Sequence, residues 1–407
     1  PAQTWDDIAA AVTKGIEETA PTPALLNAFM SDIAVASAPN AVMKAQVLYD
    51  AILRRVRLLG VSLFDLGRMV PPHTDVALTK KYGNNYARLV LMHFALKHLG
   101  INSAIGFVDS WDEGIHESIP TLGQAADVVL RINADGKPLY VTADMDYMPF
   151  GILPSSYQGA RACFIIDGHC LFETLPEGGP DWNSDSQQVF VDIQSDGSFD
   201  VSEIRSPRGT LETSLRGLRA AKQRDIKNWA QGVVKRIHPK AELISFALSN
   251  LDDLTVPVSY TLRYRIPQAA LQIGDSLLGF RNYWVGYQAG SASLAKRKYP
   301  MEYWACSDDQ NTVIFRLPDG FSWVPWGRTF QYQCDCLAYS CNFNQHMGTL
   351  IFSDRYRVFR KEYDVNETYP HYREALTRMA EMSNQWILLE RVSASATTKI
   401  PSGEPGK

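Results

Sequence analysis

The sequence predicts an α+β fold, in which helices and an antiparallel sheet come first and a β-sandwich follows. Three observations predict it. Apolar residues recur at the helical period before residue 100, short strand-like segments follow, and alternating stretches dominate after residue 243. Of the 407 residues, 45% are hydrophobic and 21% are charged, a composition that allows two or three packed domains.

The N-terminal part is predicted to be mainly helical. The pattern is clearest in residues 40–58, where Asn40 can cap the helix and five apolar residues recur every three or four positions. A further helix begins at Asn85 and ends before Gly100. In order, the helices expected in this part span residues 3–20, 22–37, 40–58, 74–81 and 85–97.

Strands are predicted from residue 103 onward, and Asp135-Gly136 is the turn of a hairpin. The first group comprises residues 103–108, 127–132, 139–142, 163–167 and 189–193. A long amphipathic helix over 209–237, which could begin as a strand instead, then leads into the β-sandwich. The sandwich strands are predicted at 243–249, 256–266, 311–317, 329–343 and 348–362, followed by a helix at 369–384 and a strand at 385–391.

These patterns divide the chain into a domain over residues 1–204, a β-sandwich domain over 205–392 and a tail over 393–407. The tail is rich in Ser, Thr, Pro, Gly and Lys and is expected to be disordered. The net charge of −4 gives no electrostatic footprint for nucleic acid, and no apolar run is long enough to span a membrane. No cofactor is expected, and the sequence leaves the oligomeric state open.

Two segments carry a family resemblance. The first is Tyr82-Gly83-Asn84-Asn85 ahead of its helix, and the second is residues 139–154, which end in Pro-Phe-Gly-Ile-Leu-Pro. They resemble the core of bacterial transglutaminase-like proteins, in which Gly-Asp-Cys opens the helix and Asp-Pro-Thr-Asp precedes Pro-Phe-Gly-x-Leu-Pro. The resemblance covers roughly residues 25–175 well and 205–392 more loosely. It implies a papain/transglutaminase-like core with a downstream β-domain.

The resemblance places three residues at the catalytic positions. Asn85 stands at the thiol position, Asp127 at the histidine position and Thr142 at the acid position, separated by 42 and 15 residues. A Cys-His-Asp triad needs a thiolate, a base and an acid that orients the base, and none of these three side chains replaces its counterpart. We therefore expect a catalytically inactive protein with a binding or structural role.

The former cleft is expected to retain a ligand. Trp111, Tyr147 and Phe150 are candidates for stacking on a peptide, protein or glycan, and Asp127 with Asp144 would make the groove acidic. The alternative is an enzyme of another class, in which Asp127 acts with Asp144 or His116 as acid and base. Family members usually carry an export signal and a further domain upstream. The start at Pro1 without Met is therefore interpreted as trimming, and an exported or periplasmic bacterial protein is expected.

Six cysteines raise the question of a metal. Cys334, Cys336, Cys341 and His346 could be zinc ligands, but a single strand over 329–343 would point Cys341 away from the other two cysteines. No metal site is predicted. Core thiols, or a disulfide involving Cys306, fit the pattern better.

Overall fold

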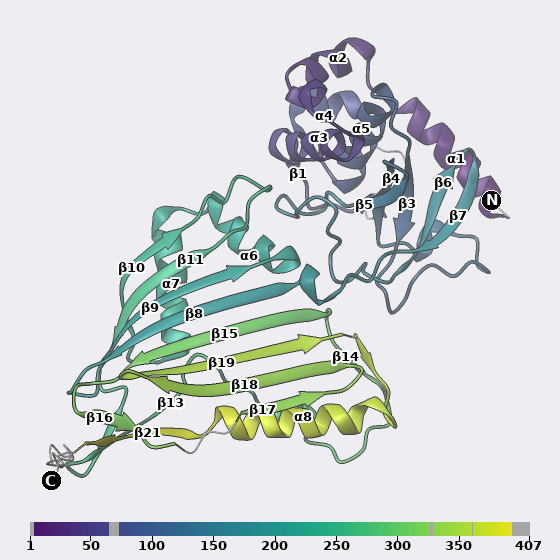
Figure 1. The fold of residues 1–407 in the computed structure, drawn as a ribbon. Coiled ribbons are helices and arrows are strands. Elements are labelled where there is room, and N and C mark those ends of the chain that lie inside the picture. The colour runs from purple at the N-terminus through teal and green to yellow at the C-terminus, as the bar shows by residue number, and fades with distance from the viewer. Residues whose placement is uncertain (1–3, 65–72, 326–328, 360, 393–407) are drawn as a thin grey trace, which may run out of the picture.

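The computed structural model describes residues 4–64, 73–325, 329–359 and 361–392, so Pro1 and the predicted tail lie outside the described residues. Figure 1 shows two lobes: a smaller N-terminal lobe of helices and a short sheet, and a larger C-terminal lobe built on a wide sheet. The predicted α+β class is confirmed.

The helices of the first lobe begin close to the predicted positions. Asn40 caps α3 by accepting a hydrogen bond from the Met43 N–H at 2.8 Å. The predicted helix over 22–37 is shorter, because its second half forms the 3₁₀ turn η1 (Ala34–Ser37). The α-helices of this lobe are α1 (Trp5–Glu18), α2 (Pro23–Ser31), α3 (Ala41–Arg55), α4 (Thr74–Lys80) and α5 (Asn85–His98).

An antiparallel five-stranded sheet completes the first lobe, in the order β5-β4-β3-β6-β7. Asp135 and Gly136 form the predicted hairpin turn with φ of 50° and 81°. α5 packs on β3 and β4, so the helix that begins at Asn85 lies directly against the strand that begins at Asp127. The strands are β3 (Ser103–Val108), β4 (Asp127–Ala134), β5 (Lys137–Val141), β6 (Arg161–Ile166) and β7 (His169–Thr174); β1 (Arg57–Leu58) and β2 (Tyr82–Gly83) form a separate short parallel pair.

The second lobe is centred on an eight-stranded sheet in the order β10-β11-β9-β8-β15-β19-β18-β17. All neighbours in it are antiparallel except β8 and β15, which run parallel. Its strands are β8 (Ser184–Ile193), β9 (Phe199–Pro207), β10 (Glu242–Leu248), β11 (Tyr260–Ile266), β15 (Ser307–Arg316), β17 (Phe330–Gln333), β18 (Leu337–His346) and β19 (Thr349–Val358).

A four-stranded sheet packs on the large one and forms the expected sandwich. The Phe280 ring lies 5.3 Å from Phe315 and 5.1 Å from Phe199, which joins the two sheets through one apolar core. The rest of this covered face lies beneath the helices α7 (Gln223–Ile237) and α8 (Thr368–Ser383) (Figure 1). The small sheet contains β12 (Leu271–Ile273), β13 (Leu277–Arg281), β21 (Trp386–Arg391) and β16 (Phe321–Trp323), and β14 (Met301–Glu302) pairs separately with β20 (Glu362–Tyr363).

Three sequence expectations change at this level. The predicted boundary at residue 204 falls within β9; because β8 and β9 pair in the large sheet, sheet membership puts the division between β7 and β8. The predicted helix over 209–237 is broken into η5 (Gly209–Leu211), α6 (Glu212–Arg216), η6 (Gly217–Ala220) and α7, since Ala221 and Lys222 are extended. The predicted strand over 329–343 is the β17–β18 hairpin, with its turn at Cys334–Cys336.

The lobes meet at a buried lysine. Lys361, just before β20, is only 3% exposed, and its ammonium group donates to the carbonyl oxygens of Ser155, at 2.9 Å, and Gln158. Burial lowers the pKa of Lys361. Among the described residues, no helix is long and apolar enough to cross a membrane.

Candidate functional site

The three predicted triad positions come together where α5, β4 and the segment after β5 meet. Asn84 caps α5, accepting from the Ala87 N–H at 3.0 Å, and this places Asn85 in the first turn of the helix. Asp127 begins β4 and Thr142 directly follows β5. We call Asn85, Asp127, Thr142 and Asp144 the relic site, a name taken from the sequence expectation alone.

The Asn85 side chain is hydrogen-bonded through both ends of its amide. Its nitrogen donates to Asp127 Oδ1 at 2.7 Å and to the Val128 carbonyl at 2.9 Å. Its oxygen accepts from the Ala143 N–H at 2.8 Å. Both amide protons are therefore used within the protein, and the residue is only 6% exposed. The Asn85 side chain is therefore a structural link between three elements.

Asp127 is held from several sides. Besides Asn85, its Oδ1 accepts from the Val128 N–H at 2.8 Å, and the Tyr157 hydroxyl lies 3.4 Å from Oδ2. Burial raises the pKa of Asp127, and these hydrogen bonds oppose the rise because they favour the ionised form.

Thr142 does not bond the other two triad positions through its side chain. The fully buried hydroxyl instead donates to Asp144 Oδ1 at 2.9 Å. Burial, and then repulsion from Asp127, raise the pKa of Asp144 to about 6. The relic site thus contains two nearby carboxylates that resist simultaneous ionisation.

A buried arginine supports the relic site, and sequence reasoning missed it. Arg88, one turn after Asn85, has no exposed surface and donates to the carbonyl oxygens of Val56 and Ala143, the latter at 3.0 Å. It also forms an ion pair with Asp146 at 2.5 Å. The available signal was a lone charge within the apolar run of α5, which rarely stays buried without partners.

The predicted stacking residues do not converge on one groove. Trp111 lies beneath the Lys361 ammonium at 5.3 Å, and Tyr147 beneath the Arg219 guanidinium at 4.4 Å, so cations of the second lobe cover both rings. Phe150 packs edge-on against Tyr49, with ring centroids 5.6 Å apart. Two of the rings thus contact cations of the second lobe, and Phe150 packs on the core of the first lobe.

His116 is exposed, and its hydrogen bonds with Gln124 run through its backbone. Nothing in these contacts orients its ring toward the two carboxylates.

A cleft lies between the lobes, and its lining residues Met145 and Met148 follow the relic-site residue Asp144 closely in the sequence. It has a volume of about 410 Å³ and is formed by Met145, Met148 and residues 154–156 on one side. The other side consists of residues 210–211 and 213–214 together with Trp304, which is 49% exposed. Among the described residues, no charged side chain lines it. We call it the interlobe cleft.

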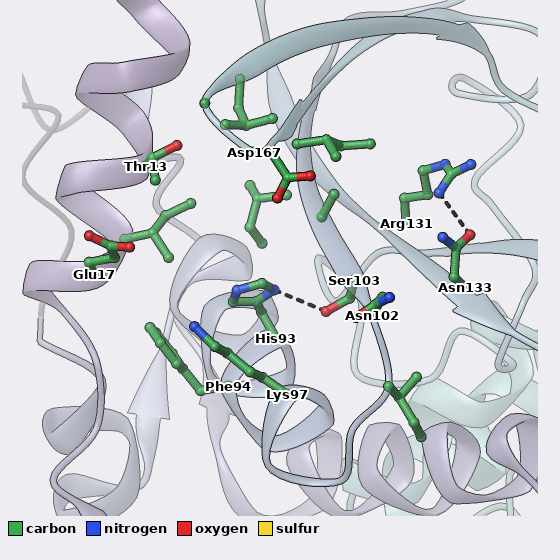
Figure 2. Close-up of a pocket in the computed structure, with 17 residues that line it drawn as sticks. Thr13, Glu17, His93, Phe94, Lys97, Asn102, Ser103, Arg131, Asn133 and Asp167 are labelled. Atoms are coloured by element: carbon green, nitrogen blue, oxygen red, sulfur yellow. Dashed lines mark hydrogen bonds between the residues drawn. The ribbon is translucent and has the colours of Figure 1, made fainter.

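A larger cavity, of about 570 Å³, lies toward the C-terminal end of α5 and involves α1, β3, β4 and β6 (Figure 2). It opens where β3 and β6 separate, because their pairing covers only Gly106–Val108 of β3. In it, His93 Nδ1 lies 2.9 Å from the Ser103 hydroxyl, and burial, then Lys97, lower the pKa of His93 to about 4. A histidine of that pKa is a weak base, and Asn85 and Asp127 do not line this cavity.

None of the six cysteines belongs to the relic site. All six are unbridged; Cys163 and Cys170 lie in β6 and β7, and the others belong to the second lobe. In the β17–β18 turn, the Cys334 and Cys336 sulfur atoms are 2.9 Å apart, and with Asp335 they bring three potential metal-ligand atoms within 4.8 Å. Cys341 and His346 are not part of that group.

Comparison with known proteins gives information about the fold class. No protein-family model and no curated protein matches the chain. A solved structure from Parabacteroides distasonis, described as "a putative protease", is similar with a TM-score of 0.58 and 12% identity over 96% of this chain. The match spans 59% of that protein. At this identity the likeness concerns the fold alone, so the chain is an α+β protein whose arrangement recurs in that structure.

Proposed function

We propose that this chain is a catalytically inactive transglutaminase-like protein that binds a peptide, protein or glycan beside the relic site. The observation that carries the proposal is the Asn85 side chain, whose amide is bonded to Asp127, Val128 and Ala143. An amide nitrogen is not a nucleophile, and this one already donates both of its protons.

The base and the acid that the family's reaction requires are missing as well as the nucleophile. Cysteine acyl transfer requires a base that takes the thiol proton and an acid that orients the base. Asp127 is instead an acceptor for Asn85, and the Thr142 hydroxyl is directed to Asp144. The three substitutions fit one another as a hydrogen-bonded structure, which supports a protein that kept the fold after losing the reaction.

The interlobe cleft is the better candidate for the retained ligand site. It adjoins the segment that carries Thr142 and Asp144, and its lining combines the exposed Trp304 ring with methionines and several hydroxyl groups. Because none of its described lining residues is charged, an uncharged peptide segment or glycan would suit it better than a strongly charged ligand. Asp127 and Asp144 do not line this cleft.

The proposal is tested by two measurements on the whole chain. Transamidation and peptidase assays should show no thiol-dependent turnover, and iodoacetamide should change nothing. Uncharged peptides and oligosaccharides, screened by calorimetry, should include a ligand that Trp304→Ala weakens and Trp386→Ala, an exposed control on β21, leaves unchanged. Turnover abolished by alkylation, or ligands indifferent to Trp304, would contradict the proposal.

A second candidate rests on the carboxylate pair. Asp144 has a pKa of about 6, close to that of a working general acid, and Asp127 contributes to that rise. An enzyme of another class would use them as acid and base. It predicts hydrolase, lyase or isomerase activity lost in both Asp127→Asn and Asp144→Asn; activity unchanged in either variant would reject it. For the variant of this proposal that pairs Asp127 with His116, no side-chain contact of His116 among the described residues gives support, since its hydrogen bonds with Gln124 are made by its backbone.

A further inference from the structure

A separate pocket lies in the second lobe, between α7 and the large sheet. It has a volume of about 420 Å³, within the range of roughly 300–1,000 Å³ that small-molecule sites occupy. Strands β8, β9 and β11 form its floor, and α7 covers this part of the sheet in Figure 1. We call it the helix–sheet pocket.

The floor of the helix–sheet pocket contains a fixed, buried carboxylate. Glu203 is 1% exposed; it accepts from Gln187 Nε2 and from the Tyr264 hydroxyl, each at 2.9 Å. Trp284 Nε1 in turn donates to that hydroxyl at 2.5 Å. Burial raises the pKa of Glu203, and these bonds oppose the rise. A buried network of this kind is held rigid, which is what a recognition surface needs.

Asp185, the neighbouring carboxylate on the floor, has hydrogen-bond donors for only one of its two oxygens. Arg205 directs its Nε, at 2.6 Å, and a terminal nitrogen, at 2.5 Å, to Asp185 Oδ2. Asp185 Oδ1 is buried and finds no hydrogen-bond donor among the described residues. An unsatisfied buried acceptor costs about 1–3 kcal/mol. Because Asp185 Oδ1 exposes less than 1 Å² of surface, an incoming donor gains this bond only when the surrounding side chains shift.

The walls provide aromatic and apolar surface with balanced charge. Two acids, Asp185 and Glu203, are matched by two bases, Arg205 and Arg236, so the lining does not select a net charge. The aromatic side chains that line the pocket are Trp229, Tyr260, Tyr283 and Trp284.

We infer that the helix–sheet pocket binds a neutral, polyhydroxylated ring, that is, a saccharide unit. Its C–H faces would pack on the aromatic walls, and its hydroxyl groups would form hydrogen bonds with the polar side chains of the floor. One hydroxyl would donate to Asp185 Oδ1 once the side chains that cover this oxygen shift. A purely apolar ligand would leave Asp185 Oδ1 unsatisfied, and the matched acids and bases of the lining give a charged ligand no net attraction. This inference does not depend on the relic site or the interlobe cleft.

The test uses the full chain titrated with maltose, cellobiose, lactose and chitobiose by calorimetry and saturation-transfer NMR. At least one disaccharide should bind. Asp185→Asn should weaken it about tenfold or more, the equivalent of the ~1.5–3 kcal/mol typical of a hydrogen bond to a charged group. Asp192→Asn, on the same strand but outside the pocket, should leave affinity unchanged.

A second pair of variants keeps the test sound if Asp185→Asn does not fold. Arg236→Ala removes an exposed pocket residue of α7 and should weaken binding, whereas Arg224→Ala, exposed on the same helix outside the pocket, should not. Leu211 and Ser214 line both this pocket and the interlobe cleft and are left intact. The inference is overturned if none of the four disaccharides binds, or if binding ignores both pocket variants. Binding lost only in Trp304→Ala would also overturn it and leave the interlobe cleft as the ligand site.

Discussion

The relic site and the helix–sheet pocket both bury carboxylates, but they complete their hydrogen bonding differently. In the relic site, the Asn85 amide is bonded within the protein at both ends, and Asp127 accepts from two neighbours on one oxygen. In the helix–sheet pocket, two arginine nitrogens share one oxygen of Asp185 and the other is left without a described donor. In the relic site these groups have hydrogen-bond partners within the protein, whereas in the helix–sheet pocket one carboxylate oxygen has none among the described residues.

A raised pKa does not separate the two regions. Asp144 in the first lobe and Asp309 in the second, on β15 opposite Asp185 in the sheet register, both have a pKa of about 6, with burial as the first cause. Burial alone perturbs carboxylates wherever a polar network is enclosed. Whether the polar atoms that line a cavity have hydrogen-bond partners is therefore a better guide to a ligand site than a raised pKa.

The largest expected effect concerns Arg88. Arg88→Met leaves Asp146 and the carbonyl oxygens of Val56 and Ala143 without their donor inside the first lobe. Breaking a buried pair from one side typically costs about 3–5 kcal/mol, so urea unfolding should show a loss of that size. Arg224→Met, at an exposed ion pair, should change stability by less than about 1 kcal/mol. A small effect at Arg88 would mean that the relic site is not structurally supported as described.

The next effect tests whether Asn85 is a structural link. Asn85→Asp keeps the shape but replaces two donors by acceptors beside Asp127 and the Val128 carbonyl. At pH 7 the free energy of unfolding should fall by about 2 kcal/mol or more, because acceptors face each other without protons. Part of the loss should return at pH 5, where one carboxyl can be protonated. Asn27→Asp, exposed on α2, is the control, and equal effects in both variants would refute the link.

A third prediction follows from the pKa of Asp144. It is about 6 in the folded protein against an ordinary value of 3.8, so the folded state holds this proton more tightly than the unfolded state does. The stabilisation is complete below about pH 4 and is lost as the pH rises through 6. Asp144→Asn should therefore be more stable than the natural chain at pH 7, by up to about 3 kcal/mol, with the gap closing toward pH 4.

Thermal and urea unfolding across this pH range would check that prediction. Asp309→Asn should show the same trend, and the exposed Asp167→Asn should show none. A difference that grows toward low pH would reverse the sign and contradict the assignment.

The smallest effect is expected at His116. His116→Ala removes an exposed ring whose residue is held by backbone bonds to Gln124, so stability should change by less than about 0.5 kcal/mol. Ligand binding at the interlobe cleft and at the helix–sheet pocket should also be unchanged. A larger change in binding would restore His116 to the group of functional residues.

The sequence by itself determined local structure and the proximity of the relic positions. Asn40 and Asn84 begin helices as caps, because their side chains satisfy free N–H groups at the helix ends wherever those helices pack. The Asp135-Gly136 turn likewise depends on backbone preferences of the residues themselves. The resemblance assigned Asn85 and Asp127 to neighbouring catalytic positions, and the structure places their side chains 2.7 Å apart.

Only the tertiary structure decided which side chains meet across distant segments. Nothing local indicates that Lys361 would cover Trp111, that Arg219 would cover Tyr147, or that β8 would pair with β15 in another part of the chain. The helix–sheet pocket arises the same way, from a helix laid over strands far from it in sequence. Burial and hydrogen bonding depend on the whole packed arrangement. A sequence pattern can therefore indicate where a carboxylate lies, but only the folded structure decides whether each of its oxygens has a hydrogen-bond donor.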